Sequence, residues 1–229
     1  MTVLYEDNHI IIVNKASGEI VQGDKTGDKP LSEIVKEYLK EKYNKPGNVF
    51  CGVIHRLDRP TTGIVVFAKT SKALSRLNEM FRYDKVDKIY WAIVRNSPPK
   101  LEDTLVHWLI KNEKKNKSTA YDSEKKGTKK AVMHYKIIGT SENYLLLEID
   151  LETGRHHQAR TQLAKIGSPI KGDLKYGAKR SNADGSISLH ARGISFIHPV
   201  SNTKIEVTAP VPEDNLWQSF DISNSNSRV

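Results

Sequence analysis

An unbroken apolar run, Ile64–Ala68, directly follows a segment of charged and small residues, His55–Gly63. A short run rich in β-branched residues and bounded by Pro and Gly is typical of a buried β-strand. The preceding segment is then the loop at the entrance to that strand, and it places Asp58 between Arg56 and Arg59. Because nearby cations favour an ionised carboxyl group, Asp58 is predicted to be charged at neutral pH. A charged aspartate of this kind is a nucleophile, a base or one partner of a structural ion pair.

Similar apolar runs recur along the chain and indicate many strands and few helices. Helices are predicted over residues 31–43, after an N-cap at Ser71 up to residue 81, and from about residue 153 to residue 166, where apolar positions recur at helical spacing. Strands are predicted over residues 9–14, 63–69, 88–94, 104–110, 131–138, 144–151, 187–197 and 203–209, with a first strand starting near Val3. We expect one catalytic domain over residues 1–218, followed by a disordered polar tail over residues 219–229.

The composition excludes several kinds of site. The 229 residues include a single cysteine, Cys51, which excludes an intrachain disulfide and a multi-cysteine zinc site. The adjacent His156 and His157 would point about 100° apart on a helix, so they cannot share a metal ion. The sequence has no 18-residue apolar run, and residues 1–6 have no basic-then-apolar leader. A cytoplasmic protein without a metal site is therefore expected.

The charge balance favours a polyanionic partner. The formal net charge is +9 at pH 7, and the sequence pI is about 9.4. Residues 111–130 hold eight lysines and three acids. This segment is either a solvated, mobile loop or an arm whose lysines neutralise RNA phosphates. The lysines assigned to phosphate contact are Lys114, Lys115, Lys125 and Lys126.

Four short segments share their order and spacing with a known family. They are HRLDRPTTG at residues 55–63, KIYWAIV at 88–94, LETGRHHQAR at 151–160 with GDLKYG at 172–177, and LHA and FIHP within 189–199. Together they resemble the RluA family of RNA pseudouridine synthases. Thr62 replaces the usual serine of the first segment, and His156 replaces a usual threonine in the third. These departures concern the substrate side of the site more than its chemistry.

The resemblance implies an α+β fold whose mixed, mainly antiparallel central sheet is flanked by helices and loops. It also implies isomerisation of uridine to pseudouridine in rRNA or tRNA. Asp58 would act at the ribose, either by attack on C1′ or by abstraction of the 2′ proton. Tyr90 would stack on the uracil with its oxygen near C5, although a core aromatic residue is the alternative. Arg155 would pair with Asp58, and no metal or redox cofactor would be needed.

The resemblance also assigns residues to the RNA. His55 and Arg56 lie on the substrate side, where Arg56 would stack on bases and fill the place of an extruded uridine. A structural ion pair is the alternative for Arg56. Leu163 would line the uracil pocket, although such residues are more often plain core. Because the chain leaves no room for the N-terminal RNA-binding module of some relatives, RNA selection is expected to rest on residues 111–130 of a monomer.

Two other functions stay open at this point. One is a non-catalytic RNA-binding or ribosome-assembly module on the same fold, which would not need Asp58, Tyr90 and Arg155 together. The other is a glycosidic hydrolase that combines Asp58 with a second carboxylate, Asp173 or Glu152. Such an enzyme needs its two carboxyl groups about 5 to 10 Å apart.

Overall fold

The computed structural model describes residues 1–220, which form one 11-stranded sheet with helices packed against it. The strands are β1 (Thr2–Glu6), β2 (Ile10–Lys15), β3 (Gly52–Val53), β4 (Thr62–Ala68), β5 (Asp87–Val94), β6 (Glu102–Asn112), β7 (Lys117–Tyr121), β8 (Lys129–Thr140), β9 (Leu145–Leu151), β10 (Leu189–Ile197) and β11 (Lys204–Thr208). The helices are α1 (Leu31–Lys42), α2 (Ser71–Arg82), α3 (Gln158–Lys165) and α4 (Asn215–Gln218), with a 3₁₀ turn η1 (Leu174–Tyr176).

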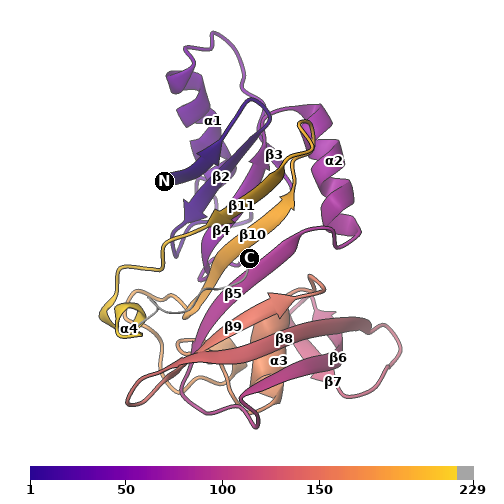
Figure 1. Ribbon diagram of the computed structural model, residues 1–229, viewed down its shortest axis with the longest axis vertical. Coiled ribbons are helices and arrows are strands. Elements are labelled where there is room, and N and C mark those ends of the chain that lie inside the picture. The colour runs from indigo at the N-terminus through magenta and orange to yellow at the C-terminus, as the bar shows by residue number, and fades with distance from the viewer. Residues whose placement is uncertain (221–229) are drawn as a thin grey trace.

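The strands follow the order β1-β2-β4-β10-β5-β9-β8-β6-β7, with β3 paired to β4 and β11 paired to β10. Within residues 1–220, β4 and β10 form the one parallel pair, and the other pairings are antiparallel. Figure 1 shows α1 and α2 beside the strands of the upper half and α3 with β6–β9 in the lower half. The predicted α+β fold with a mixed, mainly antiparallel sheet is confirmed.

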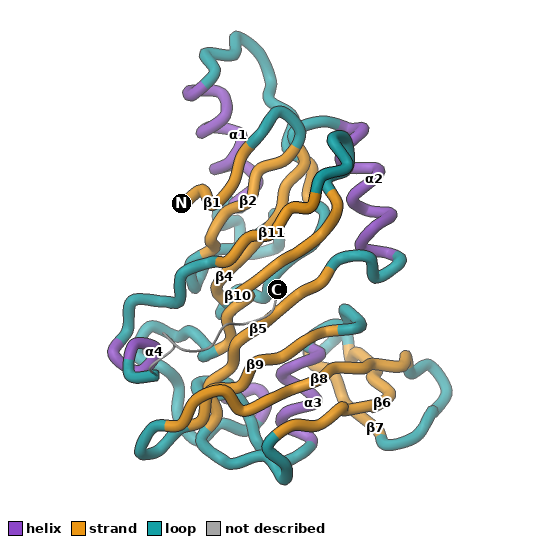
Figure 2. The backbone as a smooth tube through the Cα atoms, viewed as in Figure 1, coloured by secondary structure: helices purple, strands orange, loops and turns teal. Residues whose placement is uncertain are grey.

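Each long helix buries one apolar stripe against the sheet. In α1, Leu31, Val35 and Leu39 recur every four residues and are at most 1% exposed. In the tube of Figure 2, α3 lies behind the strands of the lower half, and it contacts β6 and β7. Two helix starts differ from the prediction. The N-cap of α2 is Thr70, whose side chain accepts a hydrogen bond from the backbone of Ala73 at 3.2 Å, and α3 begins only at Gln158.

The parallel pair of β4 and β10 depends on a close backbone approach at Gly63. This residue has φ +111°, and a Cβ atom there would lie 2.3 Å from the carbonyl oxygen of Ala191. Next to it, the Thr62 hydroxyl lies 2.8 Å from Nδ1 of buried His190. Thr62 therefore supplies the hydroxyl that the family's usual serine would bring. The contact fixes the start of β4, directly after the loop that carries Asp58.

The lysine-rich segment 111–130 is not a mobile loop. Its middle residues form β7, which pairs with β6 in register Asn112 to Lys117. Lys114 and Lys115 lie in the exposed turn between β6 and β7, and Lys125 and Lys126 lie in the exposed connection from β7 to β8. The mobile-loop interpretation is wrong because β7 is a strand whose alternate side chains, Ser118 and Ala120, are buried. Two buried residues in a lysine-rich segment form too short a pattern to be recognised in the sequence. The two lysine pairs therefore lie at opposite ends of one strand.

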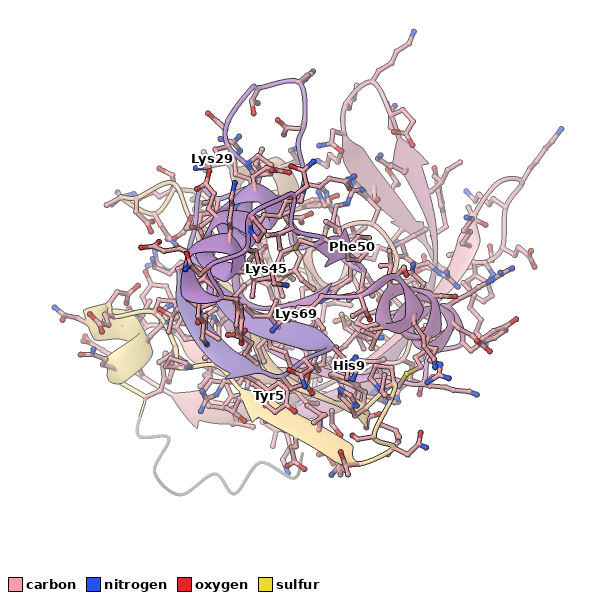
Figure 3. All side chains as sticks on the ribbon, turned by 90° about the horizontal axis from the view of Figure 1, so that it is seen from above. Tyr5, His9, Lys29, Lys45, Phe50 and Lys69 are labelled. Atoms are coloured by element: carbon pink, nitrogen blue, oxygen red, sulfur yellow. The ribbon has the colours of Figure 1, made fainter. Side chains whose placement is uncertain are left out.

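At the far end of the sheet, Glu6 attaches α1 to the strands. Its carboxylate lies 2.7 Å from Nζ of Lys69 and 2.7 Å from Nζ of Lys42, and it accepts a hydrogen bond from the Tyr43 hydroxyl. Burial opposes ionisation, but these partners outweigh it and lower the pKa of Glu6 to about 2. Figure 3 views the molecule from this end, with Lys45 and Lys69 labelled.

The chain remains packed up to the last described residue. Trp217 and Phe220 are 2% and 4% exposed and belong to one apolar cluster with Trp91 and Leu146. Packing thus extends past the predicted domain boundary at residue 218. The remaining residues of the predicted tail, 221–229, lie outside the described residues. Among residues 1–220, no helix combines the length and the apolar character needed to cross a bilayer.

Candidate active site

A buried lysine holds the loop that carries Asp58. Lys15 of β2 is 1% exposed, and its Nζ donates hydrogen bonds to the carbonyl oxygens of Ala16, Arg59 and Thr61 at 2.9, 3.0 and 2.7 Å. Burial lowers the pKa of Lys15 to about 8. Because two of the three carbonyls closely follow Asp58 in the chain, Lys15 fixes the backbone on which this aspartate stands. No pattern in the sequence around Lys15 indicates this role.

Arg160 of α3 connects Asp58 to a second, buried aspartate. Its Nη1 donates to Oδ2 of Asp58 at 2.7 Å, and its Nε and Nη2 donate to the two carboxylate oxygens of Asp173 at 2.7 and 2.9 Å. The side chains of Arg160 and Asp173 are 5% and 1% exposed, whereas that of Asp58 is 30% exposed. The guanidinium group also lies over the ring of Tyr176, 5.1 Å from its centroid. Arg160 is thus locked in place while Asp58 still reaches solvent.

The prediction that Arg155 pairs with Asp58 is wrong. Arg155 is exposed, and its Nε donates to the carbonyl oxygen of Lys130 at 2.9 Å. The reason lies in the turn before α3, where the Gln158 side chain accepts hydrogen bonds from the Thr153 hydroxyl and the Arg155 backbone at 2.8 and 3.0 Å. This turn delays the start of the helix and directs Arg155 outward.

Asp58 pairs with His157 and Arg160, which are three positions apart, His157 directly before α3 and Arg160 in its first turn. Residues at this spacing share one face of a helix, which is the signal in the sequence that could have identified the pair. Nε2 of His157 lies 3.4 Å from Oδ2 of Asp58. Burial opposes ionisation of Asp58, but His157 and Arg160 outweigh it and hold the pKa of this carboxyl group well below its usual range.

Asp58 opens into a cavity of about 690 Å³. Its apolar wall includes Tyr90 of β5, Leu151 at the end of β9, Ala159 of α3 and Leu189 of β10. Burial, together with the negative charge of Asp58, raises the pKa of Tyr90, so its hydroxyl is neutral. This volume lies within the range of small-ligand sites in proteins. The structure therefore brings Asp58 and Tyr90, both predicted from the sequence, to one cavity.

The rim of this cavity is basic. Arg56, Arg82, Lys88 and Arg155 contribute to its lining. Arg56 is exposed, and the structure of residues 1–220 gives it no ion pair, whereas Arg59 pairs with Asp28. The alternative of a structural ion pair for Arg56 therefore has no support among the described residues. A cationic rim over an apolar wall suits an anionic ligand that carries a flat base.

His55 and Leu163 serve the framework rather than the open face of the site. His55 lines the cavity, but its Nε2 accepts a hydrogen bond from the backbone of Val66 at 3.0 Å and its ring stacks on Phe81 with centroids 4.8 Å apart. Burial lowers the pKa of His55 to about 4, so the ring is neutral. Leu163 is fully buried in the core with Leu147 and is not among the cavity residues. Its predicted place in a uracil pocket is not supported, because the side chain of Leu163 lies inside the core, whereas Ala159, one turn earlier in α3, reaches the cavity.

Neither candidate second carboxylate faces Asp58 across the cavity. Both oxygens of Asp173 accept hydrogen bonds from Arg160, and the residue is 1% exposed. Glu152 pairs with His134 and does not line the cavity. A glycosidic hydrolase needs a second carboxyl group that can reach the scissile bond. Neither Asp173 nor Glu152 provides it here.

Comparison with known proteins identifies the family. A family model described as RNA pseudouridylate synthase matches residues 9–165, more than half of the chain. The chain belongs to the RNA pseudouridylate synthase family. The resemblance to pseudouridine synthases that four segments predicted is therefore confirmed.

Two relatives and one solved structure illustrate the match. The chain is 30% identical to the tRNA pseudouridine synthase C of Vibrio parahaemolyticus, covering 96% of this chain and 93% of that protein. It is 32% identical to the ribosomal large subunit pseudouridine synthase D of Zymomonas mobilis, covering 99% of this chain and 74% of that protein. Human RNA pseudouridylate synthase domain containing 4 shares the fold, with a TM-score of 0.77 at 22% identity over 93% of this chain and 89% of that one. Several other pseudouridine synthases are longer, and the chain spans 66 to 68% of their length.

The contrast between Arg160 and Arg155 can be tested through stability. Arg160→Gln leaves the carboxylate of Asp173 buried without its cation, so we expect the free energy of unfolding to fall by about 3–5 kcal/mol. Arg155→Gln alters an exposed side chain, and a change below about 0.5 kcal/mol is expected. Urea unfolding at pH 7 measures both variants. Equal losses in the two variants would contradict the assignment of Arg160 as the buried partner.

Proposed function

We propose that this chain isomerises specific uridines to pseudouridine in structured RNA, either rRNA or tRNA, with Asp58 as the nucleophile or base. The observation that carries this proposal is the setting of Asp58, an ionised carboxylate on one wall of a cavity that also contains Tyr90. The names of relatives support both RNA classes, because one is a tRNA pseudouridine synthase and another is a pseudouridine synthase of the large ribosomal subunit. We assign the activity to the unit formed by residues 1–220, because Phe220 still packs in its core.

The reaction breaks one bond to the ribose and forms another. In the first route, an oxygen of Asp58 bonds to C1′ while the N1–C1′ bond breaks and uracil leaves with the electron pair. After the base rotates, C5 attacks C1′ and releases Asp58, the C5 proton is removed, and N1 gains a proton. In the second route, Asp58 removes the 2′ proton, and a C1′=C2′ double bond forms as the N1–C1′ bond breaks. After the base rotates, C5 bonds to C1′ while the proton returns to C2′, and C5 then loses its proton and N1 gains one as in the first route. Both routes conserve all atoms and transfer no net electrons, so no redox cofactor is needed, and we propose that no metal takes part either.

Tyr90 and Arg160 support different parts of this sequence. The neutral ring of Tyr90 offers an apolar surface on which the freed uracil can stack, and its oxygen is the group we assign to C5. Arg160 keeps Asp58 ionised and aimed before the substrate arrives, so no reorganisation is needed during the reaction. Arg155 joins the cationic rim in this scheme instead of pairing with the acid.

A uridine in a folded stem must leave the base stack before it can enter the cavity. Extrusion costs a few kcal/mol. Arg56 is the residue we assign to this step, because it is exposed, borders the cavity and carries a planar guanidinium group that can replace a stacked base. His55 supports the loop next to it through the contact with Val66.

The lysines of the two β7 connections extend the positive surface. Lys114 and Lys115 stand beside Asn116, whose side-chain oxygen lies 3.1 Å from Nε2 of His156 at the cavity. The pair Lys125 and Lys126 lies at the other end of β7. We propose that all four contact phosphates, with the first pair closer to the reacting nucleotide. Since RNA is the substrate, we also place the protein in the cytoplasm, and we expect it to act as a monomer.

A non-catalytic RNA-binding or ribosome-assembly module on the same fold is the alternative. Such a module needs the basic rim but gains nothing from burying Arg160 and Asp173 behind Asp58. Burying charges costs free energy that RNA affinity alone does not recover. The cost is understandable if Asp58 must be held in one orientation for chemistry.

Asp58→Asn tests the proposed function. The amide keeps the shape of the side chain but neither its charge nor its nucleophilicity, so turnover should fall by about 10³-fold or more, equivalent to about 4 kcal/mol of barrier. The variant should fold and bind RNA, because Arg160 keeps its contacts with Asp173. Unmodified rRNA and tRNA transcripts are incubated with each protein, and pseudouridine is mapped by mass spectrometry. Activity within about tenfold of the wild type would overturn the role of Asp58.

The lysine pairs can be tested separately. Lys114→Ala with Lys115→Ala, and Lys125→Ala with Lys126→Ala, should each flatten the dependence of RNA affinity on salt, by about 0.7 to 0.9 in the log–log slope for each phosphate that is no longer neutralised. Catalysis on bound RNA should persist. A control with Lys29→Ala and Lys45→Ala (labelled in Figure 3) removes the same charge from residues that do not line the cavity and should change the slope less. An unchanged slope combined with a slow single-turnover reaction would contradict the role in phosphate contact.

A further inference from the structure

His157 holds a backbone conformation that side chains rarely adopt. It lies directly before α3 with φ 55° and ψ 28°, in the left-handed region. For a residue with a Cβ atom this conformation costs about 1–2 kcal/mol, and glycine or asparagine would adopt it more easily. The ring is nevertheless buried, with the side chain 4% exposed. A buried imidazole at a strained position indicates that its contacts are needed there.

The contacts of the ring define which nitrogen carries its proton. Nδ1 of His157 lies 2.8 Å from the hydroxyl of Tyr176, and the same hydroxyl oxygen accepts a hydrogen bond from the backbone N–H of Ser118 at 2.8 Å. Nδ1 can accept the proton of this hydroxyl. An ionised carboxylate accepts hydrogen bonds and cannot donate them, so the nitrogen that faces Asp58, Nε2, is the one that carries a proton.

The side chains of Arg160 and His157 both approach the same carboxylate oxygen of Asp58, Oδ2. Nη1 of Arg160 lies 2.7 Å from Oδ2, and Nε2 of His157 lies 3.4 Å from Oδ2. The second distance is longer than an ordinary hydrogen bond, as is common in a site without its substrate. Within residues 1–220, Oδ1 of Asp58 accepts no side-chain or backbone hydrogen bond. One oxygen is held from two directions, the other has no such partner, and Asp58 itself lines the cavity.

We propose, on the basis of the proposed function, that His157 is a positioning residue which, backed by Tyr176, fixes Oδ2 of Asp58 and so presents Oδ1 to the ribose. Arg160 alone would restrain Oδ2 from one side and leave the carboxylate free to rotate about that contact. His157 adds a second direction of restraint. Lys15 of β2, Tyr90 of β5 and His156 also act on Asp58 through their charge or position, and none of the three forms a hydrogen bond with its carboxylate.

His157→Asn is the test variant, because asparagine tolerates the left-handed backbone but is too short to contact both Tyr176 and Asp58. The rate constant is measured in single-turnover reactions at saturating RNA, with the transcript that the wild-type protein modifies. We expect a loss of about 10²-fold, typical of a misplaced reacting group, with the Kd for RNA within about twofold of the wild type. His157→Gln carries an amide N–H₂ that reaches Oδ2, and it should recover the rate to within about tenfold. His134→Asn, an exposed histidine away from the cavity, is the matched control and should react at the wild-type rate.

Tyr176→Phe provides a second, independent variant. It removes the hydroxyl behind Nδ1 and should slow the wild-type reaction, yet it should cause no further loss in the His157→Asn background, because the two residues act through one contact. A wild-type rate in His157→Asn would overturn the proposal. So would parallel losses of melting temperature, RNA affinity and rate without recovery in His157→Gln, which indicate a structural role alone. If Asp58→Asn is active, the proposed function fails; if Asp58→Asn is inactive while His157→Asn is fully active, only this inference fails.

Discussion

The buried guanidinium group of Arg160 is the interaction on which the rest of the site depends. It joins Asp58 of the loop before β4 to Asp173 of the segment before η1, so three distant parts of the chain meet at one cation. Asp173 accepts hydrogen bonds from Nε and Nη2 and keeps the cation in place, which leaves Nη1 for Asp58. A charged carboxylate can therefore stand beside an apolar cavity without taking up a proton.

The fold was largely predictable because its strands carry strong local signals. Buried runs such as Ile64–Ala68 and Trp91–Val94 alternate with turn residues, and α1 repeats its apolar residues every four positions. The parts of the fold that were not predicted from the sequence depend on tertiary contacts. The strand β7 has only two buried side chains among lysines, and the start of α3 is set by the Gln158 side chain rather than by local preference. No local pattern predicts the close approach of Gly63 to β10.

The chemistry of the site was predictable, but the contacts that hold it were not. Asp58 and Tyr90 follow from motifs, and they do line one cavity. The partner of Asp58 is Arg160 and not the predicted Arg155. The sequence does not reveal where the turn before α3 ends, so it does not indicate which of the two arginines faces Asp58. Lys15 also escaped prediction, since it holds the loop through backbone carbonyls. Backbone contacts over long sequence separations have no local signature.

The ionised, fixed state of Asp58 is the central claim, and its carboxyl titration tests this claim most directly. In the full chain labelled at the aspartate carboxyl carbons, the Asp58 signal is assigned by its loss in Asp58→Asn and followed by ¹³C NMR from neutral to acid pH. We predict that Asp58 stays ionised at pH values where solvent-exposed aspartates have taken up protons, since Arg160 and His157 lower its pKa. Titration of Asp58 together with the exposed aspartates would contradict the claim.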